Sequence, residues 1–281
     1  MSKLKGQLVF ITGGSSGIGL ETASLLAAAG CRLVLFARNR DKLTEACRRI
    51  RENRAGRSVP EEVSVGAISM DVADNNNVRQ QIDTAVDSYG IPDILINSAG
   101  IGTADYFENI TWEQFDRVMK INVYGTRNTI SAALPHMKQK GRGHIVNLSS
   151  AAGLLGMFGY TLYSTSKYAL VGLSECLRSE LKLFNIRVTV VCPPEVKTPF
   201  IDDESQTIPP EARAIKQLAG QLQPGYTART IVRGIKKNRF LVIPGLRARF
   251  LYFSHRLSNG FLTRMPSDLI VRWVARKQPR R

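Results

Sequence analysis

Short runs of apolar residues alternate along the chain with longer segments in which apolar positions recur at helical spacing. The short runs, such as VFIT, LVLF, ILIN and VTVVC, are typical of strands buried on both faces of a parallel sheet. They predict strands over residues 8–12, 32–37, 62–69, 94–97, 144–148, 187–192 and 240–243. The segments between them predict helices over residues 17–29, 40–51, 75–89, 111–137, 161–184 and 228–237.

The alternation of strand and helix predicts the fold class. Successive strand–helix–strand units build one parallel sheet with helices on both faces, a Rossmann-type doubly wound α/β fold. Right-handed crossovers place the carboxyl ends of the strands at one edge of the sheet, where such folds bind ligands. No stretch rich in Gly, Pro or Ser divides the chain, so we expect a single domain over residues 1–243 and a C-terminal extension over residues 244–281.

The composition is that of an ordinary globular protein. Of the 281 residues, 43% are hydrophobic and 22% are charged, and no window reaches the roughly 18 uncharged apolar residues that a membrane-spanning helix needs. The opening residues lack a secretory signal and the four cysteines lack paired spacing, so we expect a cytoplasmic protein with reduced thiols. The three histidines are equally scattered, and we expect no metal site.

The net charge of +16 is concentrated near the C-terminus. Residues 229–281 hold 14 Lys or Arg and one acidic residue, whereas residues 1–228 hold 25 basic and 22 acidic residues. If the extension is helical, its apolar residues form two stripes, each flanked by Arg or Lys residues. The first stripe is Leu246, Phe250, Phe253 and Leu257. The second follows Ser267 as a helix cap and is Leu269, Ile270, Trp273 and Val274. Basic amphipathic helices commonly lie at a lipid interface. The pattern favours an anionic membrane surface as the partner of residues 246–281, with packing on the domain or on a second subunit as the alternative.

The segment TGGSSGIG, residues 12–19, joins the first predicted strand to the first predicted helix. Gly13 and Gly17 would allow a tight turn, and Gly19 would let the helix approach the sheet closely. The free N–H groups of the helix N-terminus would then face an anion. A turn without a ligand is the alternative, but the strand–turn–helix context favours the phosphates of a dinucleotide. No GxxxxGK[ST] motif occurs, so the segment is not the phosphate loop of an ATPase.

The end of the second predicted strand bears on which dinucleotide binds. A site for NAD would place Asp or Glu here, to bond the ribose 2′-hydroxyl. The chain has Ala37 in that position, followed by Arg38 and, one helical turn later, Lys42. A guanidinium can bind a 2′-phosphate through two hydrogen bonds, so these residues favour NADP(H). The alternative for Arg38 is a solvated surface charge.

Five motifs together resemble the short-chain dehydrogenase/reductase family. They are TGGSSGIG, the segment NSAG at residues 97–100, Asn122, Ser150 and Tyr163-x-x-x-Lys167. The resemblance covers residues 6–243 and departs from the family pattern at Ser98 and Pro194, where the family usually has Asn and Gly. It implies hydride transfer between a nicotinamide cofactor and a ketone or alcohol. It also implies cofactor contacts from Gly13, Ser15, Ser16, Gly17, Ile18, Gly19, Arg38, Lys42, Asp71, Val72, Asn97, Ala99, Gly100, Tyr163, Lys167, Pro193, Val196 and Thr198.

The resemblance implies a catalytic set of Asn122, Ser150, Tyr163 and Lys167. Tyr163 would be the proton donor, because Lys167 stands four residues later on the same helical face and its charge would lower the tyrosine pKa, whereas Tyr160 has no such lysine. Ser150, rather than its neighbour Ser149, would hydrogen-bond the substrate carbonyl by family alignment.

Asn122 and Asp71 each have a functional and a structural interpretation. Asn122 would hold a water that relays protons to Lys167. Its alternative is a buried side chain that bonds the backbone. Asp71 would contact adenine, and its alternative is a helix cap.

Substrate selection in this family comes from the segment after the sixth strand, and residues 195–223 have the polar, irregular pattern of a lid. The pattern PPxxxTP at residues 193–199 and the segment LLGMFGY before the tyrosine resemble 3-ketodihydrosphingosine reductases, which use NADPH. An apolar wall from Leu154, Leu155, Met157 and Phe158 would line the substrate pocket, with Tyr160 beside it. The alternatives are reduction of a 3-oxoacyl thioester and oxidation or reduction of a steroid or retinoid.

Other classes of function fit less of the sequence. A catalytically silent NADP(H)-binding protein would not need all four residues of the catalytic set, and a nucleic-acid binder would need a recognisable reading motif besides a basic tail. The resemblance also implies a homo-oligomer, because the helices over residues 111–137 and 161–184 form the subunit interface in much of the family. We therefore expect an NADP(H)-dependent enzyme that is cytoplasmic or peripheral on the cytoplasmic face of a membrane.

Overall fold

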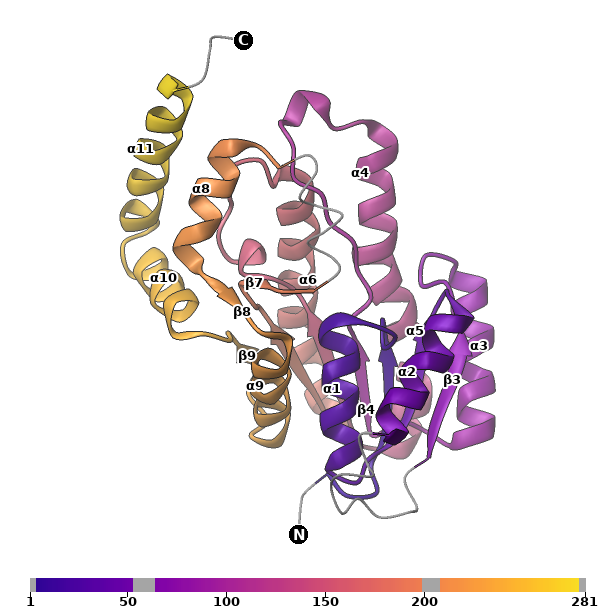
Figure 1. Cartoon of the computed structure of the whole chain (residues 1–281). Coiled ribbons are helices and arrows are strands. Elements are labelled where there is room, and N and C mark those ends of the chain that lie inside the picture. The colour runs from indigo at the N-terminus through magenta and orange to yellow at the C-terminus, as the bar shows by residue number, and fades with distance from the viewer. Residues whose placement is uncertain (1–3, 53–63, 199–207, 278–281) are drawn as a thin grey trace.

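A parallel sheet of seven strands is the centre of the computed structural model, which describes residues 4–52, 64–198 and 208–277 (Figure 1). Its strands are β1 (Leu8–Thr12), β2 (Arg32–Ala37), β3 (Val65–Ser69), β4 (Ile94–Asn97), β5 (Gly143–Leu148), β6 (Ile186–Val191) and β9 (Leu241–Val242). Their order in the sheet is β3-β2-β1-β4-β5-β6-β9, which confirms the doubly wound parallel arrangement. All seven predicted strands form, and residues 62–63 of the third prediction lie outside the described part of the chain.

Helices cover both faces of this sheet and bury a separate apolar cluster on each face. One face carries α1 (Gly17–Ala28), α2 (Arg40–Glu52) and α9 (Pro224–Lys236), and the other carries α3 (Asn75–Tyr89), α5 (Gly125–Lys140) and α6 (Thr161–Glu180). Val9 and Ile11 of β1 point into the first cluster, whereas Leu8 and Phe10 point into the second. Because successive side chains of a strand point to opposite faces, a strand covered on both sides must be apolar throughout.

The predicted helix over residues 111–137 is interrupted near its middle. Thr111 caps α4 (Trp112–Met119) in a capping box with Gln114. A π-helical turn, η2 (Lys120–Tyr124), joins α4 to α5 and contains Asn122. Such turns occur frequently at functional sites. Within the described part of the chain, three short 3₁₀ helices lie between these elements: η1 (Phe107–Asn109), η3 (Ala151–Gly153) and η4 (Leu181–Phe184). The last replaces the end of the helix predicted over residues 161–184.

The predicted lid and the C-terminal extension lie together at one side of the sheet (Figure 1). The lid contains β7 (Glu195–Val196), which pairs with β8 (Gln221–Leu222), and α8 (Pro210–Ala219), while its residues 199–207 lie outside the described part of the chain. The extension forms α10 (Leu246–Leu257) and α11 (Phe261–Lys277), and α11 packs along α8. Ser267 lies inside α11, so the prediction that it begins a helix is wrong. Among the described helices, none is both long and apolar enough to cross a membrane.

Candidate active site

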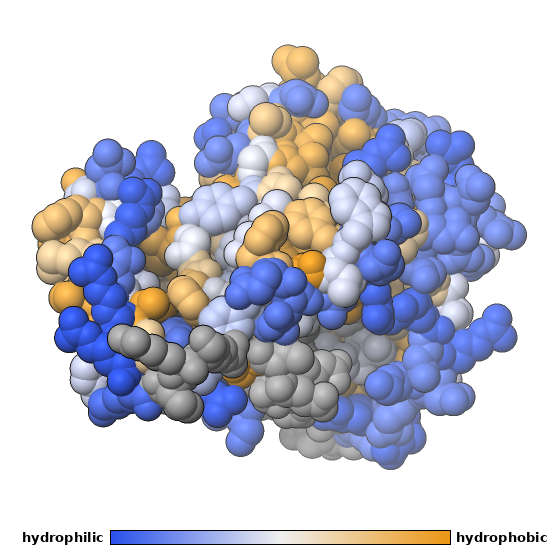
Figure 2. Space-filling model, turned by 90° about the horizontal axis from the view of Figure 1, so that it is seen from above, coloured by the Kyte–Doolittle hydropathy of each residue, from blue (hydrophilic) through white to orange (hydrophobic). Residues whose placement is uncertain are grey.

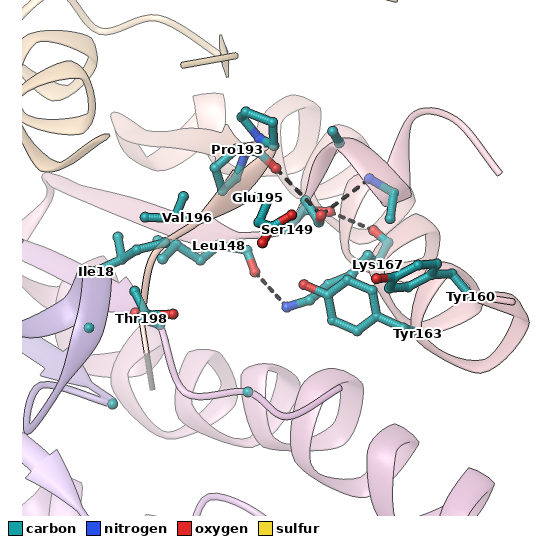
Figure 3. Close-up of a pocket in the computed structure, with 18 of the residues that line it drawn as sticks. Ile18, Leu148, Ser149, Tyr160, Tyr163, Lys167, Pro193, Glu195, Val196 and Thr198 are labelled. Atoms are coloured by element: carbon teal, nitrogen blue, oxygen red, sulfur yellow. Dashed lines mark hydrogen bonds between the residues drawn. The ribbon is translucent and has the colours of Figure 1, made fainter. Parts of the chain in front are cut away.

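A cavity of about 240 Å³ opens at the carboxyl edge of the sheet, where β1, β4, β5 and β6 end (Figure 3). Its lining comes from the glycine loop after β1, from the ends of β4, β5 and β6, from α6 and the segment before it, and from the lid. The lining residues are Gly13, Ser16, Gly17, Ile18, Ser98, Ala99, Gly100, Leu148, Ser149, Ser150, Ala151, Ala152, Met157, Tyr160, Tyr163, Lys167, Pro193, Pro194, Glu195, Val196, Thr198 and Lys216. Fourteen of the residues predicted to bind cofactor or substrate or to act in catalysis are among them.

The glycine loop leaves no room for side chains where it turns from β1 into α1. Gly13 has a φ of +65°, and a Cβ there would lie 2.7 Å from the backbone nitrogen of Ala99. A Cβ on Gly19 would collide with the carbonyl oxygen of Gly13. The loop therefore needs glycine at both positions, and its backbone borders the cavity directly. Ser16 is the N-cap residue of α1, so the free N–H groups of this helix begin at the cavity.

Tyr163 and Lys167 lie one helical turn apart on α6 and both reach the cavity. Nζ of Lys167 is 5.5 Å from the centre of the Tyr163 ring and donates a hydrogen bond to the carbonyl oxygen of Leu148 at 3.1 Å. Only 5% of Lys167 is exposed, and this burial lowers the pKa of its ammonium group to about 8. Tyr160 packs edge-on against Tyr163, with 6.2 Å between the ring centres. The residue four positions after Tyr160 is Ser164, so Tyr160 has no lysine one helical turn later.

The two adjacent serines after β5 have different partners. Oγ of Ser149 is buried and donates a 2.8 Å hydrogen bond to the carbonyl oxygen of Lys167, so it joins β5 to α6. Oγ of Ser150 accepts a hydrogen bond from the backbone N–H of Ala152 at 3.2 Å and donates a long one, 3.4 Å, to the carbonyl oxygen of Pro193. Of the two serines, Ser150 therefore donates the longer and weaker hydrogen bond.

Asn122 lies beneath the cavity rather than in its lining. Its side chain is fully buried and bonds both backbone groups of Ile101, with Oδ1 accepting at 2.9 Å and Nδ2 donating at 2.8 Å. The alternative from the sequence, a buried side chain that bonds the backbone, therefore describes its contacts. A Cβ on Gly100 would lie 3.1 Å from Oδ1 of Asn122 and 3.4 Å from Nζ of Lys167, so both groups adjoin the same glycine.

Several predicted cofactor residues lie away from the cavity lining. Arg38 and Lys42 are exposed beyond the end of β2, and among the described residues Arg38 forms no ion pair. The Asn97 side chain is turned into the sheet, where it bonds Asn147 and Thr129. Ser15, Gly19, Asp71 and Val72 also lie outside the lining.

The helix-cap alternative for Asp71 is wrong. Asp74 caps α3 by accepting hydrogen bonds from the N–H groups of Asn76 and Asn77. Oδ1 of Asp71 instead accepts from the N–H of Ala73, within the loop that follows β3.

The apolar wall predicted near Tyr163 is only partly present. Met157 and Tyr160 line the cavity, but Leu154 packs against a cluster formed by Val190, Cys192, Ile243 and Ala248. Leu154 is therefore a packing residue beneath α10 rather than part of the pocket. The sequence analysis missed Glu195 and Lys216, which line the cavity from the lid. No motif could have identified Lys216, because only the folding of α8 over the cavity brings it there.

Comparisons with known proteins agree with this geometry. A family model described as short chain dehydrogenase matches residues 7–209. The 3-ketodihydrosphingosine reductase of Bos taurus is 39% identical over 238 residues, 84% of this chain and 70% of the bovine protein, and that of Mus musculus is 38% identical with the same coverage. A solved short-chain dehydrogenase/reductase from Burkholderia phymatum, in complex with NAD, is 24% identical with a TM-score of 0.78, covering 92% of this chain and 97% of that chain. The chain therefore belongs to the short-chain dehydrogenase family and is an oxidoreductase.

Proposed function

We propose that the protein is an NADPH-dependent reductase that converts the ketone of a hydrophobic, long-chain lipid to a secondary alcohol, with 3-ketodihydrosphingosine as its substrate. The observation that carries this proposal is the Tyr163–Lys167 pair inside a cavity that also reaches the glycine loop. The substrate class is supported by the names of the bovine and murine relatives.

The residues around the glycine loop fit a nicotinamide dinucleotide. The close backbone at Gly13 and the N-terminus of α1 provide N–H groups for its phosphates, and the cavity continues from this loop to Tyr163. When bound, the dinucleotide supplies the hydride that reduces the ketone. Arg38 is exposed just beyond the end of β2. A carboxylate in this region would repel the 2′-phosphate of NADPH, whereas the Arg38 guanidinium can bind it, so Arg38 supports NADPH over NADH.

Tyr163 acts as the general acid. Its O–H bond breaks as a new O–H bond forms on the carbonyl oxygen, and the remaining phenolate is stabilised by the Lys167 ammonium. Because the pKa of Lys167 is about 8, the ammonium is the main form at neutral pH and can return a proton to Tyr163. Ser150 donates a second hydrogen bond to the carbonyl oxygen, exchanging its long contact with Pro193 for a shorter one.

Asn122 positions the proton path to Lys167. Its Oδ1 and the Lys167 Nζ flank Gly100, and its amide is fixed by the backbone of Ile101. A water held in this region would connect Lys167 to solvent, as expected from the sequence.

The side of the cavity away from the glycine loop supports a hydrophobic substrate. Met157, Ala151 and Ala152 contribute apolar surface there, and Leu148 and Val196 extend the apolar lining towards Ile18 of the glycine loop (Figure 3). A long alkyl chain placed against these residues would leave water, which is the main favourable contribution to its binding.

We infer that α10 and α11 bind the surface of an anionic membrane and place the enzyme peripherally on its cytoplasmic face. Their outer sides carry exposed apolar residues, which are Leu246, Phe250, Phe253, Leu257, Phe261, Leu262, Met265, Leu269 and Trp273. Figure 2 supports this: apolar side chains lie among hydrophilic ones at its left, where these helices are. The inner sides pack on the domain, as α11 does on α8, so one helix pair serves both contacts.

We also infer that a second copy of the chain covers α4–α6, as the family resemblance implies. Trp112, Tyr124 and Tyr168 are 76%, 53% and 44% exposed on these elements, and large aromatic residues are enriched at interfaces. Light scattering coupled to gel filtration measures the mass, and a monomer at micromolar concentration would contradict this inference.

The experiment that tests the proposed activity follows the oxidation of NADPH and NADH with three ketones in parallel. These are 3-ketodihydrosphingosine, a 3-oxoacyl thioester and a steroid ketone. We expect turnover of the sphingoid ketone with NADPH at a kcat/KM well above that of the other combinations. Turnover of the thioester or the steroid alone would reassign the substrate, and no turnover of any ketone would reject the reductase activity.

A further inference from the structure

A charged pair, Glu195 and Lys216, lies in the part of the cavity lining that the lid contributes. Nζ of Lys216 is 3.4 Å from Oε2 of Glu195, and these side chains are only 15% and 16% exposed. Both residues line the cavity. Charged groups buried to this extent lose much of their hydration, and an ion pair there contributes little net stability compared with apolar residues. Stability therefore does not account for a charged pair in this position.

The carboxylate of Glu195 is held in place from two sides. Glu195 lies opposite Gln221 in the β7–β8 pair, and Nε2 of Gln221 donates a 2.8 Å hydrogen bond to its Oε1. Lys216 comes from α8, which folds over this side of the cavity. A carboxylate has about four lone-pair positions, so Glu195 can accept a further N–H donor while it keeps both partners.

The pair lies close to the proposed reaction centre. Nζ of Lys216 is 5.9 Å from the centre of the Tyr160 ring, which packs against the ring of Tyr163. Glu195 follows Pro193 by two residues, and the carbonyl oxygen of Pro193 is the one that Ser150 contacts. Figure 3 shows Glu195 across the cavity from Tyr160 and Tyr163. A ketone held by Tyr163 and Ser150 would thus direct its neighbouring substituents towards the charged pair.

We propose that Glu195 and Lys216 form a subsite for a polar head group that carries an amine beside the ketone and a hydroxyl one carbon further. The substrate's ammonium donates to the Glu195 carboxylate, and the Lys216 ammonium donates to the hydroxyl oxygen. This inference rests on the proposed function, because 3-ketodihydrosphingosine has both groups in these positions. A site built to bond a substrate group discriminates strongly against an analogue that lacks it, which would separate sphingoid ketones from steroids and thioesters.

The test compares 3-ketodihydrosphingosine with the same ketone lacking its amine, in the wild-type protein and in Glu195→Gln. We expect Glu195→Gln to raise KM for the amino ketone about tenfold or more, with kcat little changed, because a hydrogen bond between charged groups is lost. KM for the ketone without the amine should change less than about twofold. Lys216→Met should raise KM for both ketones, because both carry the hydroxyl.

Glu211→Gln is the matched control, because Glu211 is a buried carboxylate of α8 that bonds Tyr106 and lies outside the cavity lining. It should leave the preference for the amino ketone unchanged. Glu195→Asp, which keeps the carboxylate, should retain most of this preference and serves as a second variant should Glu195→Gln not fold.

Two outcomes distinguish this subsite from the proposed function. Reduction of both ketones by the wild-type protein, with equal effects of Glu195→Gln on the two, would overturn the subsite alone. Reduction of neither ketone by the wild-type protein would overturn the proposed function and the subsite with it.

Discussion

Ser149 ties the end of β5 to α6: its Oγ donates a 2.8 Å hydrogen bond to the carbonyl oxygen of Lys167. In the opposite direction, Nζ of Lys167 donates to the carbonyl oxygen of Leu148, the residue before Ser149. These reciprocal bonds fix the buried lysine between the strand end and the helix, 5.5 Å from the Tyr163 ring. Ser150, the next residue, also lines the cavity, so the end of β5 both positions the lysine and carries the proposed catalytic serine.

Replacement of Tyr163 by Phe removes the proposed proton donor without changing the shape of the ring. We expect kcat for ketone reduction to fall about 100-fold or more, because general acid catalysis contributes on this scale. Tyr160→Phe is the matched control, since Tyr160 packs against Tyr163 but has no lysine one turn ahead. Steady-state kinetics with NADPH measures both variants, and a Tyr163→Phe protein with full activity would reject the mechanism.

The two serines should separate activity from stability. Ser150→Ala removes a hydrogen bond to the developing oxyanion, and we expect kcat to fall by a factor of about 100. Ser149→Ala removes the bond to Lys167 and should lower the free energy of unfolding by about 1 kcal/mol. Steady-state kinetics and urea unfolding of both variants test the assignment of Ser150 to catalysis and of Ser149 to stability. A larger loss of kcat in Ser149→Ala than in Ser150→Ala would reverse this assignment.

Arg38→Ala tests the preference for NADPH. Loss of a charged hydrogen-bonding partner for the 2′-phosphate should raise KM for NADPH about tenfold or more and leave KM for NADH nearly unchanged. Arg40→Ala, which removes another exposed arginine two residues later, is the control. Equal changes in both KM values for Arg38→Ala would show that Arg38 does not contact the phosphate.

His144 should make the protein less stable in acid. This residue of β5 is buried, with Nε2 2.7 Å from Oγ1 of Thr189, and burial, aided by the charge of Arg187, lowers its pKa to about 4. Below pH 6.5 the unfolded chain takes up a proton that the folded protein excludes, so stability is lost as the pH falls from 6.5 through about 4. The loss is on the order of 3 kcal/mol.

His144→Gln should remove this part of the pH dependence. The measurement is the free energy of urea unfolding at pH 7 and pH 4.5, compared between variant and wild type. His136→Gln is the control, because His136 lies on the surface beside Asp83. The same loss of stability in His144→Gln as in the wild type would contradict this role of burial.

The exposed stripe of α10 should be required for binding to vesicles. The combined substitutions Leu246→Ser, Phe250→Ser and Leu257→Ser remove side chains that are 78%, 71% and 87% exposed, so they should lower vesicle affinity at least about tenfold without destabilising the fold. Leu183→Ser, at an 85% exposed residue of η4, is the control. Cosedimentation with anionic vesicles measures binding, which added salt should weaken. Unchanged binding of the triple variant would reject the membrane contact.

Much of the fold could be predicted because its signals are local. Each strand needs apolar residues on both faces, so its sequence alone marks it. The glycines at positions 13 and 19 belong to one tight turn, in which Gly13 has a positive φ and Gly19 packs against the Gly13 carbonyl. Element ends were less predictable, since capping depends on neighbours: α11 begins at Phe261 rather than at Ser267, and the helix over residues 111–137 contains a π-helical turn.

The sequence by itself determined the strand order along the chain, the glycine loop and the spacing of Tyr163 and Lys167, because these depend on residues a few positions apart. Only the tertiary structure decided which side chains share the cavity. Leu154, predicted to line it, packs beneath α10, whereas Lys216 enters it from α8 and meets Glu195. These positions follow from how α8 lies between the cavity and α11, and from the pairing of β7 with β8. Such long-range packing leaves no periodic or short-range pattern in the sequence.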